Sequence, residues 1–285
     1  MVRYEKPNSL DEALSLLGAG PWRILAGGTD VYPAQGSRPF RENVLDINAL
    51  GELRGIGSTG SHIRLGARTT WTDIVRADLP PSFDALKLAA REVGSVQIQN
   101  TGTVAGNLCN ASPAADGAPA LLVLDAEVEL RSAGATRIVP LRDFILGNRR
   151  TALAAGEMMT AILVPKASAG GTSAFVKLGA RRYLVISIAM AAARMEVVDG
   201  RVSAVAIAVG ACSAVAQRLS LLENDIVGRP ADATLLDTFR PAHFEALAPI
   251  DDVRGSAQYR VAAAREIVAR TLLAALGPAS AELAA

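Results

Sequence analysis

The chain has 285 residues, which is long enough to bury a sizeable core and to form two or three packed subdomains. It carries 29 basic and 28 acidic side chains, for a net charge of +1, and only 4% of its residues are aromatic. Balanced charge and few aromatic rings argue against nucleic acid or an anionic membrane surface as a partner.

The mean hydropathy is +0.26, a value that raises the question of a membrane span. The longest apolar runs, such as Ile188–Ala193, are far shorter than the roughly 18 residues that a span requires. The N-terminal segment contains Arg3, Glu5 and Lys6 and does not resemble a secretory signal. We therefore expect no membrane span and a cytoplasmic location.

Cysteine and histidine are sparse and scattered. Cys109 and Cys212 lie far apart without CxxC spacing, and His62 and His243 are equally isolated, so neither a disulfide framework nor a bound metal is expected. An iron–sulfur cluster normally needs four ligands, mostly cysteine thiolates. This chain cannot hold one by itself, and any such cluster must belong to a partner.

The first half of the chain predicts alternating helices and strands. Ser9 to Glu12 reads as a capping box, which begins a helix that runs to Leu17. Apolar spacing and turn residues then predict strands at 22–26 and 44–47, a hairpin over 53–65, and helices at 69–77 and 82–93.

Residues 94–118 are rich in glycine and asparagine and show little periodicity. The sequence predicts an irregular segment here, which is too long for a simple turn inside a compact domain. Because the run at 120–130 must re-enter the core, we expect a ligand to order this segment.

The remaining elements are mainly strands, followed by helices. Strands are predicted at 126–130, 136–140 and 159–164, a linker at 165–171, and further strands at 174–178, 186–197 and 201–209. Asp199-Gly200 is a hairpin signal, and residues 257–275 form the longest amphipathic stretch. The sum is an α+β protein whose last 115 or so residues differ in pattern from the rest.

The first candidate site is the loop Ala26–Asp30, which directly follows a predicted strand. Its paired glycines let backbone amides approach an anion with no Cβ in the way. The loop is neither the GxGxxG dinucleotide fingerprint nor a P-loop. Taken alone, the motif is weak evidence for an anion site, and a tight strand exit that requires glycine explains it better.

The second candidate site is the segment Thr101–Asp116, in which small residues alternate with hydroxyl and amide side chains that suit phosphate and ribose. Asp116 is an acceptor within this set, and its alternative role is to cap a helix near Pro119. Cys109 has no basic neighbour to lower its pKa, so we expect a small buried filler.

At these two loops the sequence resembles the flavin-binding subunits of the xanthine dehydrogenase and carbon monoxide dehydrogenase family of molybdenum hydroxylases. The resemblance runs nearly end to end. It rests on Leu25–Asp30, Gln97–Asn100, Thr103–Asn107, Ala111–Asp116, Gly156–Met159, Phe175–Lys177 with Arg181-Arg182, and Ser256–Arg260.

The resemblance implies a vanillyl-oxidase-like, PCMH-type fold in which two α+β subdomains bind FAD and a C-terminal domain adds a small antiparallel sheet with helices. The implied boundaries are 1–56, 57–168 and 169–285. The implied FAD contacts are Arg23, Ile24, Leu25, Ala26, Gly27, Gly28, Thr29, Asp30, Gly94, Thr103, Gly106, Asn107, Asn110, Asp116, Met159 and Lys177.

Within that set the resemblance implies distinct roles. The segment 24–30 would wrap the pyrophosphate, Asp116 would approach the flavin or its linker, and Met159 would pack near the isoalloxazine. Lys177 would place a positive charge near the reducible edge, where a cation favours the anionic reduced flavin. The alternative for Lys177 is a solvated lysine at a strand end.

Two positions depart from the family pattern. Ala105 stands where the family often has glycine, so this position must accept a Cβ or an ordinary backbone angle. Tyr183–Ser187 lacks the acidic residue that some relatives carry after the arginine pair. NAD, oxygen, a quinone and a cytochrome therefore all remain open as electron acceptors.

The function implied is that of an electron-transfer subunit. By resemblance, a large subunit holds the molybdopterin-type cofactor and hydroxylates the substrate, and a small subunit passes electrons through two [2Fe-2S] clusters to this FAD. A dimer of heterotrimers is implied. Two alternatives are a self-contained flavin oxidase, disfavoured because His62 lies on a predicted strand, and a nucleotide-binding module without redox chemistry.

Overall fold

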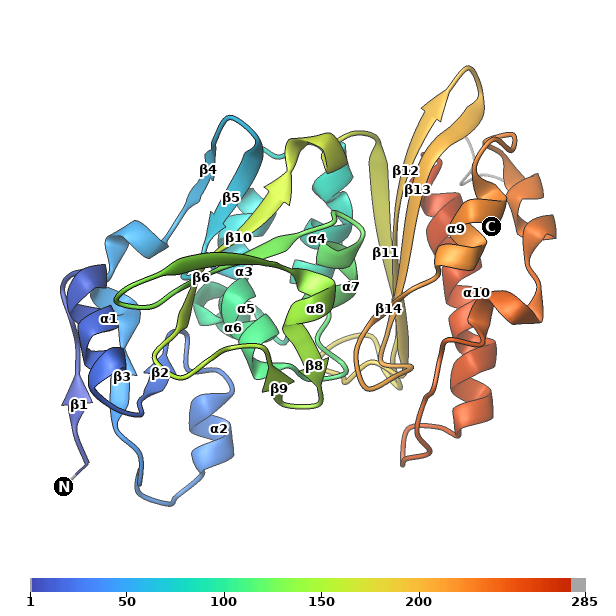
Figure 1. Cartoon of the computed structure of the whole chain (residues 1–285). Helices are drawn as coiled ribbons and strands as arrows, with labels where there is room; N and C mark the ends of the chain where they lie inside the picture. The colour runs from blue at the N-terminus through green and yellow to red at the C-terminus, as the bar shows by residue number, and fades with distance from the viewer. Residues whose placement is uncertain (1, 278–285) are drawn as a thin grey trace.

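The computed structural model describes residues 2–277 and shows a row of sheets with helices between and beside them (Figure 1). The N-terminal sheet is parallel, in the strand order β1-β3-β2. Its elements are β1 (Tyr4–Glu5), α1 (Leu10–Ala19), β2 (Arg23–Leu25), α2 (Val31–Gln35) and β3 (Val44–Asp46), followed by the 3-10 turns Ile47–Ala49 and Gly51–Leu53.

Helix α1 begins where the capping box predicted. The Ser9 hydroxyl accepts a hydrogen bond from the Glu12 amide at 3.2 Å. The Glu12 carboxylate accepts from the Asn8 amide at 2.9 Å, one residue before the predicted partner. Leu10, Ala13, Leu14 and Leu17 share one face and form a core with β3 and with Met158. This helix therefore covers the small sheet beside the first glycine loop.

The second sheet is antiparallel, in the order β4-β5-β10-β6-β7. It contains β4 (Ile56–Ser58), β5 (His62–Gly66), β6 (Glu127–Arg131), β7 (Thr136–Pro140) and β10 (Met158–Pro165). The central strand β10 is long and buried, and it lies between strands from both halves of this region. The chain segments that accompany this sheet are α3 (Trp71–Arg76), the 3-10 turn Pro81–Phe83, α4 (Asp84–Glu92), α7 (Gly117–Leu122), α8 (Leu141–Phe144), and the ribbon β8 (Ile145–Gly147) with β9 (Arg150–Thr151).

The prediction of an irregular segment at 94–118 was wrong. Two helices occupy most of it, α5 (Val96–Thr101) and α6 (Val104–Asn110), and α7 begins at its end. Helices of six or seven residues are too short to display an apolar period, and their glycines and asparagines resemble loop composition. Local caps and tertiary packing fix them instead.

The third sheet follows the 3-10 turn Lys166–Ser168, which lies in the predicted linker. It is antiparallel and contains β11 (Thr172–Leu178), β12 (Ala189–Val198), β13 (Arg201–Gly210) and β14 (Gln217–Arg218), in sequential order. The Asp199-Gly200 turn joins β12 to β13 as predicted, with both residues at positive φ. The chain ends in α9 (Ser220–Ile226), the 3-10 turns Ala233–Thr238 and Pro241–Phe244, and α10 (Ala257–Ala275).

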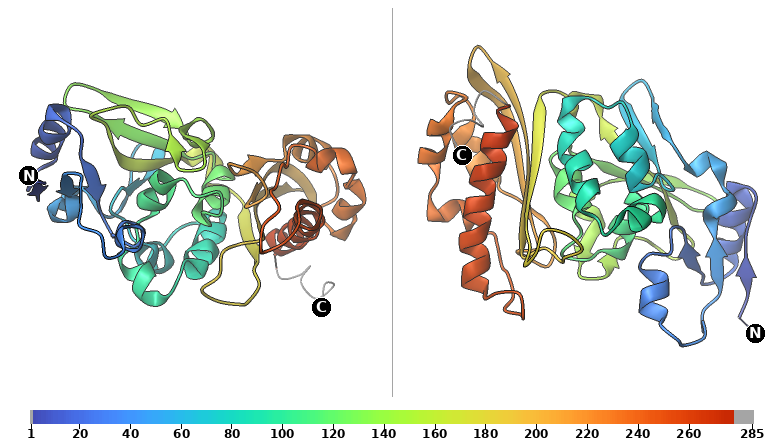
Figure 2. Two further views of the ribbon diagram at one scale, coloured as in Figure 1. Left: turned by 90° about the horizontal axis from the view of Figure 1, so that it is seen from below. Right: turned by 180° about the vertical axis from the view of Figure 1, so that it is seen from behind.

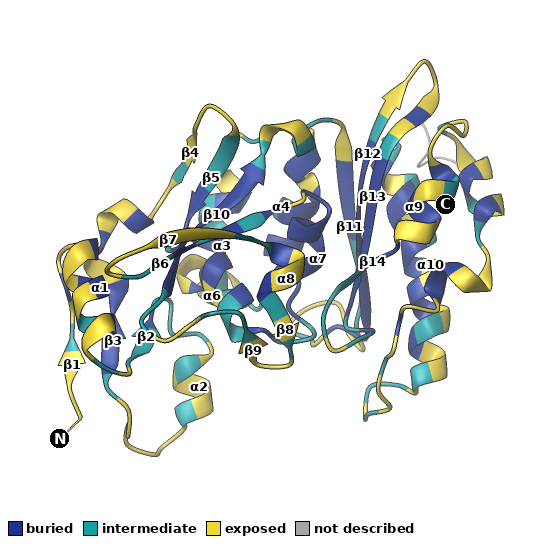
Figure 3. Cartoon of the chain, viewed as in Figure 1, coloured by how far each residue is buried: buried dark blue, intermediate teal, exposed yellow. Residues whose placement is uncertain are grey.

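Both faces of this third sheet are buried (Figure 3). Along β12, Met190 and Ala192 face the core that contains α4 and α7. Ala189, Ala191 and Ala193 face the opposite core, against α10. Figure 2 shows the same arrangement from behind, with α10 on one side of the third sheet and the helices of the N-terminal region on the other. The C-terminal part is thus firmly attached to the rest.

Within residues 2–277, no helix combines the length and apolar character needed to cross a bilayer.

Candidate functional site: a cavity between the glycine loops

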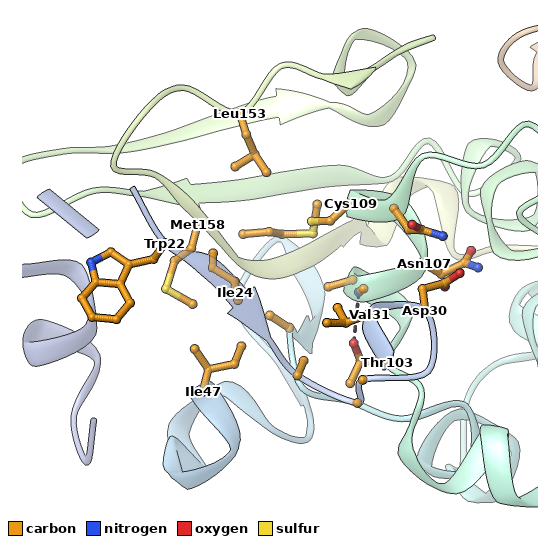
Figure 4. A pocket seen from close by; sticks show the side chains of 18 of the residues that line it. Trp22, Ile24, Asp30, Val31, Ile47, Thr103, Asn107, Cys109, Leu153 and Met158 are labelled. Atoms are coloured by element: carbon orange, nitrogen blue, oxygen red, sulfur yellow. Dashed lines mark hydrogen bonds between the residues drawn. The ribbon is translucent and has the colours of Figure 1, made fainter. Parts of the chain in front are cut away.

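A cavity of about 1000 Å³ opens between the first two sheets. Its walls come mainly from three segments that are distant in sequence, 20–31 along and after β2, 102–110 through α6, and 153–159 at the start of β10. Figure 4 shows side chains from each segment pointing toward the same space. The two glycine-bearing loops that the sequence singled out are therefore brought together, and β10 closes a third side.

Close backbone contact explains why glycine occupies the first loop. A Cβ on Gly27 would lie 2.0 Å from the Thr101 carbonyl oxygen, so the two loops meet backbone to backbone. Gly28 has φ +70°, in the left-handed region that side chains disfavour, and a Cβ there would also strike Tyr32. Any side chain at Gly27 would push the loops apart and alter the cavity wall.

Helix α6 supplies the second wall. The Thr103 hydroxyl caps it by accepting from the Gly106 amide at 3.0 Å. Ala105 lies inside this helix and is 3% exposed, which confirms that an ordinary backbone angle accommodates its Cβ. Asn107 Oδ1 is buried and has no hydrogen-bond partner among the described residues. An unpartnered buried acceptor costs about 1–3 kcal/mol, and this oxygen lies beside Gly117, behind the cavity wall.

The two ends of the cavity differ in chemistry. One end is apolar and contains Trp22, Ile47 and Met158, while Asp30 and Asn107 lie at the other (Figure 4). The Trp22 ring is fixed in place because its Nε1 donates to the Leu16 carbonyl at 2.8 Å. The cavity therefore suits an elongated ligand with an aromatic group at one end and hydrogen-bonding groups farther along.

Asp116 and Lys177 lie together but do not line this cavity. Lys177 Nζ is 2.7 Å from Asp116 Oδ2, and the two side chains are only 6% and 9% exposed. The Ser187 hydroxyl donates to Asp116 Oδ1 at 2.7 Å. The alternative of a solvated lysine is wrong, and Asp116 makes no side-chain capping bond to α7. Burial raises the pKa of Asp116, and the charge of Lys177 partly opposes this effect.

Three other predicted residues also lie outside the main cavity wall. Arg23 forms an exposed ion pair with Glu42 at 2.6 Å. Leu25 is buried and borders a smaller cleft of about 370 Å³. Gly94 has φ +58° and packs against Ile98, so it shapes the chain rather than the cavity surface. The predicted residues that do line the cavity are Ile24, Ala26, Gly27, Gly28, Thr29, Asp30, Thr103, Gly106, Asn107, Asn110 and Met159.

The apolar part of the cavity wall was not predicted from the sequence. Trp22, Ile47 and Leu153 carry no chemical signature, because apolar side chains are typical of any core. Cys109 also lines the cavity and is half-buried rather than fully buried as predicted, and desolvation raises the pKa of its thiol to about 12. Among residues 2–277, no cluster of three His, Cys, Asp or Glu side chains could hold a metal.

Known proteins share this architecture. The family described as "FAD binding domain in molybdopterin dehydrogenase" matches residues 1–167, and the "CO dehydrogenase flavoprotein C-terminal domain" matches residues 173–275. The nicotinate dehydrogenase FAD-subunit of Eubacterium barkeri is 35% identical over 89% of this chain and 89% of its own length. The carbon monoxide dehydrogenase medium chain of Hydrogenophaga pseudoflava is 32% identical over 95% and 96%.

Solved structures agree. A chain of the Cu,Mo-CO dehydrogenase superposes with a TM-score of 0.89 at 28% identity, covering 96% of this chain and 97% of that one. A chain of quinoline 2-oxidoreductase from Pseudomonas putida 86 gives 0.85 at 27% identity, with 97% of each covered. The vanillyl-oxidase-like α+β fold with a C-terminal sheet domain is confirmed. The chain belongs to the family of FAD-binding domains found in molybdopterin dehydrogenases.

Proposed function

We propose that this chain binds FAD in the cavity between its glycine loops and serves as the electron-transfer subunit of a molybdenum hydroxylase. The observation that carries the proposal is the contact of the two glycine-bearing loops at Gly27, which places both loops on the wall of one cavity. A cavity of about 1000 Å³ is large enough for a dinucleotide. FAD would supply the redox chemistry, and the residues of this chain bind and orient it.

The predicted residues would contact different parts of FAD. The segment 24–30 and the group Thr103, Gly106, Asn107 and Asn110 would contact pyrophosphate and ribose. Met159 would pack near the isoalloxazine, and the Asp116–Lys177 pair would place charge near it. Arg23, Leu25 and Gly94 would act only through the backbone that they position, because they lie outside the main cavity wall.

The assembly is part of the proposal. Relatives of nearly the same length are named as medium chains or FAD-subunits of dehydrogenases. Two [2Fe-2S] clusters in a small subunit and the molybdenum cofactor in a large subunit would complete the electron path, as the relatives' names favour. We further propose a dimer of heterotrimers and subdomain boundaries at 56/57 and 168/169. A cytoplasmic location is consistent with the two free cysteines.

The test is to purify the chain with its co-expressed partners and measure its absorbance. Bound flavin gives a band near ~450 nm, and FAD is released on denaturation. Absence of both would end the FAD proposal. Partners without molybdenum or iron would favour a nucleotide-binding module instead. Reduction of the flavin by an alcohol substrate in the isolated chain would favour a self-contained oxidase.

A further inference from the structure

Arg260 is a buried charge in the first turns of α10, with only 3% of its surface exposed. Its Nη1 donates to the Ile188 carbonyl at 2.7 Å and to the Ala211 carbonyl at 3.3 Å. Its Nη2 donates to Asp252 Oδ1 at 2.6 Å. One guanidinium therefore joins the segment that enters β12 to the segment that leaves β13.

Both of these segments also touch the FAD-binding part of the chain. Ile188 directly follows Ser187, whose hydroxyl donates to Asp116 Oδ1 at 2.7 Å. The Ala211 amide donates to the Pro113 carbonyl at 3.0 Å. Ala211 has φ +62°, a conformation that residues other than glycine rarely adopt without support. The hydrogen bonds from Arg260 thus fix the positions of the Ser187 hydroxyl and the Ala211 amide, the two donors that bond to residues 113–116.

Residues 113–116 are close to the cavity wall. They follow Asn110, which lines the cavity, and they lead into Gly117. A Cβ on Gly117 would lie 3.1 Å from Asn107 Oδ1, the unpartnered acceptor of the site. A shift of this segment would therefore be transmitted both to Asn107 and to the Asp116–Lys177 pair.

We propose that Arg260 is a positioning residue of the cofactor site, which acts through Ser187 and Ala211 to hold the Pro113–Asp116 segment against the cavity. The inference rests on the proposed binding of FAD. It assigns a function to the Ser256–Arg260 motif, which otherwise lies on the far side of the third sheet from the cavity (Figure 1). Through Arg260 the C-terminal domain thereby contributes to FAD binding from a position that does not line the cavity.

A purely structural role is the competing explanation, and Arg194 provides a matched control. Arg194 is also buried, at 6% exposure, and donates to the Val123 carbonyl at 2.9 Å. It therefore links the same sheet to the opposite end of α7, away from Asp116. Loss of either guanidinium should destabilise the fold, but only loss of Arg260 should disturb the cavity.

The experiment measures the FAD dissociation constant by flavin fluorescence, with the midpoint potential of the bound flavin as a second readout, for Arg260→Gln, Arg260→Lys and Arg194→Gln in the full chain. We expect about tenfold weaker binding and a shifted potential in Arg260→Gln, and partial rescue in Arg260→Lys. Arg194→Gln should lower Tm while leaving FAD binding within about twofold. Equal effects of Arg260→Gln and Arg194→Gln, or a change in Tm alone, would overturn the inference.

A second variant keeps the test decisive if Arg260→Gln fails to fold. Ser187→Ala removes only the hydroxyl that bonds to Asp116, and it should weaken FAD binding about threefold. Where Arg260→Gln does fold, the loss of FAD binding in the double variant should be smaller than the sum of the two single losses, because the two residues act along one path. Unchanged binding in Ser187→Ala, or strict additivity, contradicts that path. A wild-type chain without FAD would instead defeat the proposed function itself.

Discussion

The cofactor cavity and the interface between α7 and the third sheet differ in the kinds of chemical groups that form them. The cavity is made of glycine backbone, neutral hydroxyl and amide groups, and apolar side chains such as Trp22 and Met158. The interface contains buried charges at both ends of α7. Lys177 pairs with Asp116 at one end, and Arg194 and Arg218 donate to the Val123 and Leu122 carbonyls at the other.

The difference follows from what each region must do. A cavity for a large ligand must keep its own side chains out and carry polar groups in its wall, as Gly27 does for the first and Asn107 and Asn110 do for the second. An interface must fix the position of one element against another. The small side chains of the alanine-rich strand β12 interlock little with α7, so directional charged hydrogen bonds serve that purpose. We therefore expect charge removal to affect stability most at the interface, and added volume to affect binding most in the cavity.

The largest effect should come from Lys177→Met. The substitution leaves the Asp116 carboxyl buried without its cation, and breaking a buried pair in this way lowers the free energy of unfolding by about 3–5 kcal/mol. Urea denaturation of the purified chain measures the change. The double variant with Asp116→Asn should recover part of the loss, because no unpaired charge then remains.

The control for this variant is Arg3→Gln, which breaks the exposed pair between Arg3 and Glu5. Side chains that are 57% and 41% exposed are well solvated, so this loss should stay within about 0–1 kcal/mol. If both variants lower the free energy of unfolding by the same amount, the charges at α7 stabilise the fold no more than surface charges do. The contrast between the two regions would then be incorrect.

Gly27→Ala should have the next largest effect, and on binding rather than on stability. Its Cβ would lie 2.0 Å from the Thr101 carbonyl oxygen, so the loops must separate, and FAD should bind about 10- to 100-fold more weakly. Fluorescence titration with FAD measures this change. Gly51→Ala is the matched control, since no atom lies within 4 Å of its Cβ position. Equal binding by the two variants would show that loop contact does not shape the cavity.

A smaller effect should appear in acid, at the Asp252 partner of Arg260. Hydrogen bonds from the Arg254 amide, and then from the Arg260 and Arg254 side chains, lower the pKa of Asp252 to about 2 from 3.8. A lowered carboxyl pKa adds stability above the unfolded value, and this stability is lost as the pH falls through the folded value. The Tm difference between wild type and Asp252→Asn should therefore be constant at neutral pH and narrow from about pH 4 toward pH 2. Narrowing already at pH 6 would contradict this assignment.

The sequence predicted most of the fold because its strands and longer helices carry clear apolar patterns. The strands β2 and β3 and the Asp199-Gly200 hairpin were predicted in this way, whereas the parallel pairing of β2 with β3 was not. The helices α5 and α6 were not predicted either, since each spans fewer than two full turns and relies on partners distant in sequence. Thr103 shows the limit, because its capping bond to Gly106 involves a spacing that also occurs in loops.

The candidate site was predictable where backbone chemistry leaves a mark. Gly27, Gly28 and the residues of α6 were found from motifs, and the resemblance supplied Met159. Trp22 and Ile47 were not, because an apolar residue in a ligand cavity looks the same in sequence as one in a core. Nor could spacing reveal that Lys177 and Asp116, which lie on different domains, form a buried pair.

The smallest effect should come from Cys109→Ala, although this residue lines the cavity. Burial raises the pKa of the Cys109 thiol to about 12, so at neutral pH it is a neutral filler, and its loss should change FAD binding by no more than about threefold. Cys212→Ala is the counterpart in the core between the third sheet and α10, where the thiol sulfur lies 3.7 Å from the Arg260 carbonyl oxygen. Mass spectrometry after treatment of the folded chain with iodoacetamide at pH 8 should find both thiols unmodified, since burial raises both pKa values. Rapid alkylation of Cys109 alone would show instead that the cavity wall presents a reactive thiolate to its ligand.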